Sequence, residues 1–234
     1  MPGCYGQYGT IGHDCLEKYA LGELAEYELS DYYKSNFDKA VTEFFPYNKN
    51  VDLREKYYQQ GLEYFNSFSG FGDREILQVE GEYLFKIGDY NFTGKIDLEC
   101  PAEIIDHKSK AEQHLKRLNK NHDKPSYLTM LDGRFIHKDN FKQLYIYSIP
   151  FFNKYEKYPE ILSLNMFRIM DWYSIKFNLE DFEEAKQWAI NQIDSIYAAE
   201  KFEKGADASS YWCSNVCGQR LNCVHSDRYL GVEA

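Results

Sequence analysis

The hydrophobic period changes from helical to alternating near residue 70, and this change constrains the fold of the chain most. Before it, apolar residues spaced three or four positions apart predict a helix over 11–27. Two more helices are expected, one over 30–45 that ends before Pro46 and one over 51–68. The N-terminal third of the chain is therefore expected to be helical.

The alternating segments that follow predict strands. Residues 76–85 and 92–98 flank the turn residues Gly88-Asp89 and are typical of a β-hairpin, and 103–107 is expected to be a third strand. Further along we expect a helix over 140–155, a strand over 164–169 with room for a hairpin within 161–177, a long helix over 179–203 and an irregular tail. This order predicts an α/β fold, with a central mixed β-sheet of about four to five strands flanked by helices.

The length of 234 residues fits a single domain with its own core. Within it we expect an N-terminal helical part (9–70), a sheet core (75–175), and a C-terminal helix with a cysteine tail (179–234). No apolar run is long enough to cross a bilayer, and the N-terminus lacks the basic and apolar regions of a signal peptide. We therefore expect a cytoplasmic protein without membrane contact, whose cysteines are thiols or metal ligands rather than disulfides.

The net charge of −10 argues against a protein that coats nucleic acid non-specifically. A local basic stretch from Lys108 to Lys124 opposes this trend, with six basic residues against two acids. Its side chains are candidate contacts to a nucleic-acid backbone, above all Lys110, Lys116, Arg117 and Lys120. A solvated charged loop explains the same composition equally well.

Two acids and a lysine lie at the ends of neighbouring predicted strands. Asp97 comes late in the second strand of the hairpin, and Asp106 and Lys108 lie at the end of the next strand. Because residues two apart in a strand point to the same face, Asp106 and Lys108 are expected side by side, with Asp97 beside them if the strands are adjacent. Two converging carboxylates are typical of a Mg²⁺ or Mn²⁺ site, and a lysine there can stabilise charge on a phosphate.

Four motifs in a fixed order resemble those of the PD-(D/E)XK nucleases, specifically the RecB-like branch. The stretches are Gly9-Thr-Ile-Gly-His-Asp-Cys-Leu-Glu17, Phe92-Thr-Gly-Lys-Ile-Asp97, Ile104-Ile-Asp-His-Lys-Ser109 and Gln143-Leu-Tyr-Ile-Tyr147. The resemblance covers most of the chain and implies a restriction-endonuclease-like fold. One departure is Asp106, where many members of the family have Glu.

The resemblance also implies a role for each motif residue. His13, Asp97, Asp106 and the carbonyl of His107 would bind the metal ion, and Lys108 would position the attacking water or stabilise the transition state. Gln143 and Tyr147 lie four apart, on one face of a helix, and would orient the lysine or the DNA.

Three cysteines, Cys213, Cys217 and Cys223, lie within eleven residues of the tail. Close thiolates bind zinc, here with His225 as a fourth ligand, or an iron–sulfur cluster, but free thiols and a disulfide stay open as alternatives. The chain resembles iron–sulfur-containing CRISPR-associated and phage exonucleases, which implies a [4Fe–4S] cluster with Cys4 as the fourth ligand. The first cysteine gap is one residue longer here than in those proteins. Cys15 lies about 200° around the helix from His13 and is expected to point away from the metal site.

These features predict a metal-dependent DNA nuclease, most simply an exonuclease, that hydrolyses phosphodiester bonds with metal-activated water. Its partner would be DNA that is single-stranded or has free ends, with a helicase or a recombination or adaptation protein acting in trans. Two alternatives are a non-catalytic DNA-binding or recombination-partner module that keeps the fold, and a cysteine-cluster protein of regulatory function.

Overall fold

A mixed five-stranded sheet forms the centre of the computed structural model, which describes residues 3–110, 126–200 and 210–230. The strand order is β1-β2-β3-β6-β7, and all neighbouring pairs are antiparallel except β3 and β6. The strands are β1 (Gln78–Ile87), β2 (Tyr90–Glu99), β3 (Glu103–His107), β6 (Ile161–Met166) and β7 (Asp171–Lys176). The predicted α/β class and mixed sheet are thus confirmed.

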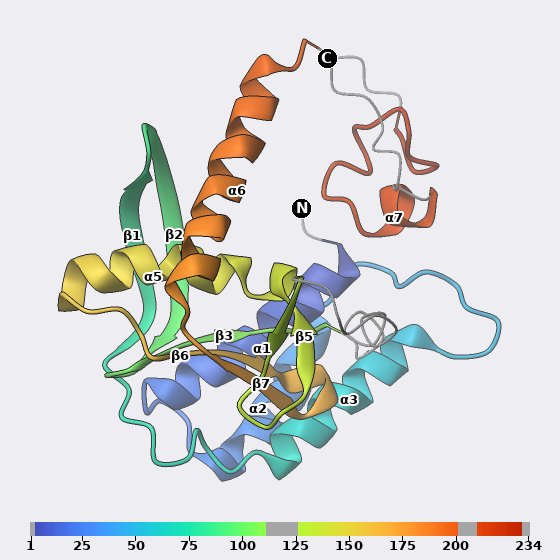
Figure 1. The fold of residues 1–234 in the computed structure, drawn as a ribbon. Helices are drawn as coiled ribbons and strands as arrows, with labels where there is room; N and C mark the ends of the chain where they lie inside the picture. The colour runs from blue at the N-terminus through green and yellow to red at the C-terminus, as the bar shows by residue number, and fades with distance from the viewer. Residues whose placement is uncertain (1–2, 111–125, 201–209, 231–234) are drawn as a thin grey trace.

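Helices cover both faces of this sheet and bury a separate apolar core on each (Figure 1). On one face lie α1 (Cys4–Ala20), α2 (Leu29–Ala40) and α3 (Leu53–Ser67), and on the other α5 (Lys142–Tyr155) and α6 (Leu179–Ala198). Strand β3 is buried throughout, and its neighbours Ile104 and Ile105 point into different cores. Successive apolar residues in β3 therefore hold the two helical layers onto the sheet.

Short elements complete the chain. The hairpin of β4 (Tyr127–Thr129) and β5 (Phe135–His137) was not predicted, and neither was α7 (Ser210–Asn215) in the tail. Single 3₁₀ turns span Glu26–Glu28, Lys138–Asn140 and Phe167–Ile169. None of the described helices combines the length and apolar character needed to span a membrane.

The first helix begins at Cys4, earlier than the predicted start after Gly9. The glycines of this segment do not mark the start of the helix. They lie within it, where the absence of a side chain allows close packing against other elements. A Cβ on Gly12 would lie 2.4 Å from the Phe167 ring, and one on Gly9 would lie 3.3 Å from Ser109 Oγ. Small residues at these positions let α1 approach the end of β3 and the turn after β6.

The second helix is shorter than predicted. It ends at Ala40, and 41–52 forms a loop instead of one more helical turn. The Arg54 guanidinium accounts for part of this ending, because it donates a hydrogen bond to the Val41 carbonyl at 2.7 Å. A helix that continued would need that carbonyl for its own backbone ladder.

Strands β2 and β3 separate soon after they pair, and this separation creates a fork in the sheet (Figure 1). Their pairing is confined to Leu98 with Ile105 and Glu99 with Ile104. At the same level the in-and-out alternation of β2 is interrupted, because Ile96 points into one core and Leu98 into the other. Residue Asp97 lies between them, at the mouth of the fork.

Candidate metal centre

Three neighbouring strands place an acid at the level of the fork. The β1–β2 register, Val79 with Leu98 and Gly81 with Ile96, puts Glu80 across from Asp97. The β2–β3 register carried one residue further puts Asp106 across from Asp97 on the other side. Residues directly opposite in antiparallel strands are close neighbours. The fork therefore brings Glu80 and Asp97 together, with Asp106 nearby on β3 but outside the group whose ligand atoms lie within 4.8 Å of one another.

His13 reaches the fork from α1. Its Nδ1 lies 3.5 Å from Asp97 Oδ2, and its Nε2 lies 2.8 Å from the His107 carbonyl oxygen. The Asp97 Oδ2 also accepts a hydrogen bond from the His107 backbone N–H at 2.6 Å. The structure thus brings His13, Asp97 and the His107 carbonyl together, as the sequence predicted. The ring of His107 itself turns away, because it is buried against Phe71 and accepts a hydrogen bond from the Asn165 amide.

The electrostatics of the fork favour a bound cation. Burial and the nearby Asp106 charge raise the pKa of Asp97 to about 8. Burial lowers the pKa of His13, so its imidazole is neutral near pH 7 and has a lone pair to offer. Two buried carboxylates beside a neutral histidine need either a proton or a positive ion to offset their repulsion.

Glu80 is a member of this site that the sequence analysis did not identify. Ligand atoms of Glu80, His13 and Asp97 all lie within 4.8 Å of one another, the one such group of acids, histidines or cysteines in the part of the chain that the structure describes. Glu80 adopts φ 51°, a conformation that is rare for a residue with a side chain, and its carboxylate pairs with Lys95 at 2.5 Å. A mixed histidine and carboxylate set of this kind suits Mg²⁺ or Mn²⁺.

Lys108 stands next to the carboxylates on the side of α5. Its Nζ lies 2.6 Å from Asp106 Oδ2, a close ion pair, although the approach lacks hydrogen-bond geometry. The same Nζ donates to Gln143 Oε1 at 2.8 Å, and Gln143 Nε2 donates to the Tyr147 hydroxyl at 2.9 Å. The predicted grouping of Lys108 with Gln143 and Tyr147 is therefore present, and this chain of bonds fixes the ammonium group at the fork.

The basic stretch after β3 is described only at its start. Lys110 is exposed and lies just past the fork, two residues after Lys108. Its predicted companions Lys116, Arg117 and Lys120 lie outside the described residues. The expectation that this stretch contacts DNA therefore stays a prediction.

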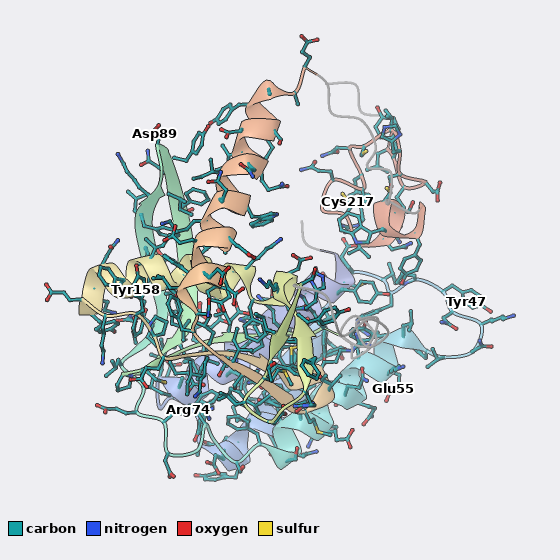
Figure 2. All side chains as sticks on the ribbon, viewed as in Figure 1. Tyr47, Glu55, Arg74, Asp89, Tyr158 and Cys217 are labelled. Atoms are coloured by element: carbon teal, nitrogen blue, oxygen red, sulfur yellow. The ribbon has the colours of Figure 1, made fainter. Side chains whose placement is uncertain are left out.

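The cysteine tail packs against the first turn of α1. A Cβ on Gly3 would lie 3.2 Å from the Asn215 carbonyl oxygen, and the hydroxyls of Tyr5 and Tyr211 lie 2.5 Å apart. Figure 2 shows Cys217 in the loop beside α7. Cys213 is buried, whereas Cys217 and Cys223 are partly exposed. The tail cysteines thus lie at the end of α1 where Cys4 begins the helix, although no three described cysteines bring their sulfurs within 4.8 Å of one another.

The fourth-ligand prediction concerns Cys4 and Cys15, which have different surroundings. Cys4 is buried, burial raises the pKa of its thiol, and the charge of Arg220 in the tail opposes this rise. Cys15 is fully buried in the core between α1, α2 and α3, away from the tail. Of the two, Cys4 is therefore the one placed next to the tail.

Known proteins give no independent indication of the family. Comparisons of the chain with protein-family models, with curated proteins and with solved structures found no match. The resemblance to the PD-(D/E)XK nucleases therefore rests on the four sequence motifs, and a function for the chain has to be argued from the geometry of the fork.

Proposed function

We propose that the chain is a divalent-metal-dependent DNA nuclease of the PD-(D/E)XK type, most simply an exonuclease. The observation that carries this proposal is that His13 lies against Asp97 at the fork, with the Asp106–Lys108 ion pair close enough for its carboxylate charge to act on Asp97. Contacts link residues of all four motifs around the fork, which is the arrangement that the likeness to the nuclease motifs implies. Glu80 adds a further carboxylate to the same point.

The first role in hydrolysis is to hold the metal ion. Imidazole and carboxylate groups of His13, Asp97 and Asp106 would hold the ion, with the His107 carbonyl beside them. The chemistry that Mg²⁺ or Mn²⁺ supplies when bound is polarisation of a phosphate oxygen and activation of water. In the displacement the water oxygen forms a bond to phosphorus while the bond from phosphorus to the leaving oxygen breaks.

Lys108 acts on the charge that this displacement creates. Its ammonium group is held by Asp106 and Gln143, so it is oriented before the substrate arrives. From that position it donates hydrogen bonds to the attacking water or to a phosphate oxygen whose negative charge grows in the transition state. The role of Gln143 and Tyr147 is to keep the lysine pointed at the reacting atoms.

The direct test is digestion of end-labelled linear DNA, single-stranded and double-stranded, with Mg²⁺ or Mn²⁺. We expect loss of label that depends on the metal ion and disappears in Asp106→Ala. The matched control is Asp89→Ala at the tip of the β1–β2 hairpin, far from the fork (Figure 2), which should cut DNA as the unchanged chain does.

The outcomes distinguish a nuclease from a non-catalytic DNA-binding module with the same fold. Cleavage that survives in both Asp106→Ala and Lys108→Ala would refute the nuclease assignment for this site. Binding of DNA without cleavage at any metal concentration would instead point to the non-catalytic module. A helicase or recombination protein acting in trans is a partner we expect to stimulate cleavage of duplex DNA, since such enzymes supply single strands.

For the tail, we propose that Cys4, Cys213, Cys217 and Cys223 bind a [4Fe–4S] cluster, with zinc as the alternative. Two observations support it: the tail packs on the first turn of α1, and Cys4 lies in that turn beside Arg220. A cluster there would tie the two ends of the chain together, closing a loop of most of its length.

Anaerobic purification followed by iron, sulfide and zinc analysis tests this second proposal. We expect iron and sulfide in the unchanged chain and their loss in Cys217→Ser. Cys100→Ser is the matched control, because Cys100 is buried at the end of β2 in the core between α1, α2 and α3. Zinc in place of iron would favour the alternative, and a chain with neither metal would contradict both.

A further inference from the structure

A groove of about 710 Å³ runs along the β1–β2 hairpin beside the fork. Its size falls within the range of about 300–1,000 Å³ that is typical of ligand sites. The groove is bordered by the hairpin on one side and by α5 on the other, and the residues that line it are Glu82, Tyr83, Leu84, Thr93, Gly94, Lys95 and Tyr147.

Both walls of the groove connect to the fork. On the hairpin side, Lys95 pairs with Glu80, a member of the candidate metal centre, at 2.5 Å. On the α5 side, the Tyr147 hydroxyl accepts a hydrogen bond from Gln143, which in turn holds Lys108. A molecule that fills the groove therefore lies directly next to the reacting phosphate.

The aromatic wall is fixed in place. Gly94 has no side chain, and a Cβ there would lie 2.7 Å from Tyr147 Cε1, so the Tyr147 ring rests directly on strand β2. Rings that are already immobilised lose little freedom when they contact a ligand.

Leu84 adds an apolar surface that the fold leaves uncovered. Its side chain is 77% exposed on the outer face of the hairpin. An exposed leucine alone needs no explanation, but here it borders the same groove as a fixed tyrosine ring and a lysine. Aromatic, apolar and cationic groups in one groove match the base and the phosphate of a nucleotide.

We propose that this groove binds the nucleotide next to the scissile phosphate, with its base unpaired against Tyr147 and Leu84 and its phosphate on Lys95. The inference rests on the proposed nuclease function and names the form of its substrate at the cut. Because the face of the base contacts protein side chains, the strand must be single at this position.

The charges around Lys95 fit this assignment once the fork holds a cation. Lys95 Nζ lies 2.5 Å from Glu80 Oε2, and Glu17 and Glu82 are further acids near it. A positive ion held by Glu80 would compete with Lys95 for that carboxylate. The ammonium group is then released toward the groove, where a phosphate can take the place of Glu80.

The test compares variants of the full chain on a labelled single-stranded oligonucleotide. Binding is measured by anisotropy in Ca²⁺, and KM is measured in Mn²⁺. Lys95→Gln and Leu84→Ser should each weaken binding and raise KM by about tenfold, equivalent to about 1.4 kcal/mol. Lys86→Gln is the matched control, because it removes the same charge from the same hairpin outside the groove, and it should change both values by less than about twofold.

A second substrate tests the base contact itself. An oligonucleotide with one abasic position next to the cut should bind the unchanged chain about tenfold more weakly. The same abasic position should cost clearly less in Leu84→Ser, since the Leu84 part of the base contact is already gone. Equal abasic losses in the two proteins would overturn the subsite.

Failure of the subsite and failure of the nuclease assignment are distinguishable. A chain that neither binds nor cuts any DNA would refute the proposed function. A chain that cuts DNA, but in which Lys95→Gln and Leu84→Ser behave like Lys86→Gln, would refute the subsite alone.

Discussion

The fork and the cysteine tail are both candidate metal sites, but the chain builds them in opposite ways. The fork takes its residues from α1, three strands and α5, and the register of the sheet sets their distances. The tail takes three of its four candidate ligands from eleven consecutive residues that lie mostly in turns. The tail cysteines, although close in sequence, therefore lie further from one another than the fork residues His13, Glu80 and Asp97, which are far apart in sequence.

The difference lies in what holds each site together. The fork is fixed by strand pairing and by two apolar cores, so its geometry does not depend on an ion. The tail is held to the rest of the chain by a few contacts, chief among them the buried Arg220, which pairs with Glu43 at 2.8 Å. We therefore expect the fork to keep its shape without metal and the tail to depend on its cofactor.

Removal of the fork lysine should have the largest effect. Lys108→Ala should lower the rate of DNA cleavage by about 10²- to 10³-fold, because it removes the donor that meets the growing negative charge. Lys86→Ala, an exposed lysine on β1 outside the fork, is the control and should retain most activity. Similar losses in both variants, measured under single-turnover conditions, would contradict a specific catalytic role for Lys108.

The tail should loosen when its buried ion pair is broken. Glu43→Gln removes the carboxylate that pairs with the buried Arg220 guanidinium, a change that costs up to about 3 kcal/mol. We expect faster proteolysis within 210–230, with DNA cleavage by the fork nearly unchanged. Glu55→Gln on the exposed side of α3 serves as the control (Figure 2). Unaltered proteolysis would show that other contacts hold the tail.

Glu80 should matter for metal binding and its neighbour Glu82 should not. Both are on β1, but Glu80 lies across from Asp97, and Glu82 pairs across from Lys95. Glu80→Gln should raise the Mn²⁺ concentration needed for half-maximal activity by about tenfold or more. An equal rise in Glu82→Gln would reduce the effect to general loss of negative charge.

Two glycines of α1 should respond oppositely to alanine. Gly12→Ala puts a methyl group into the Phe167 ring and should destabilise the fold by about 1–3 kcal/mol. Gly9→Ala meets only Ser109 Oγ at 3.3 Å and should gain from the higher helix propensity of alanine, up to about 1 kcal/mol. Chemical denaturation measures both. A Gly12→Ala chain as stable as the unchanged one would mean that α1 is free to shift away from the sheet.

The metal-free fork should make stability depend on pH. In the folded chain the pKa of Asp97 is about 8, above its ordinary 3.8, so the folded state holds the proton more tightly than the unfolded state. The stability from Asp97 is therefore present below about pH 4 and is lost as pH rises towards 8, by at most about 1.4 kcal/mol per unit. In EDTA, the stability of the unchanged chain relative to Asp97→Asn should fall between about pH 5 and about pH 8. Parallel pH curves would contradict the raised pKa.

Much of the fork could be predicted because its residues carry sequence motifs. His13, Asp97, Asp106 and Lys108 stand in recognisable surroundings. His13 lies against Asp97 and Lys108 pairs with Asp106, but Asp106 lies outside the group of ligand atoms within 4.8 Å of one another. Glu80 was missed because an acid in an alternating strand normally faces solvent. The turn at Gly88-Asp89 could have identified Glu80. A two-residue turn there pairs Ile87 with Tyr90, and this register places Glu80 across from Asp97.

The boundaries of the helices were predicted less well, for tertiary reasons. Glycines in α1 resemble a helix start when read alone, but they are there to let Phe167 and Ser109 approach. The β4–β5 hairpin has only three residues in each strand, too few for a periodic signal. The spacing of the tail cysteines did not predict where their sulfurs lie, because the turns of the tail do not by themselves bring the thiols together.

The measurement that tests the central claim most directly is a crystal structure of the chain grown with Mn²⁺, with the ion located by its anomalous scattering. The account predicts one strong peak at the fork, within bonding distance of His13, Asp97 and Asp106, which disappears in Asp106→Ala. A fork without a peak at saturating Mn²⁺, with the ion found only on surface acids, would contradict it.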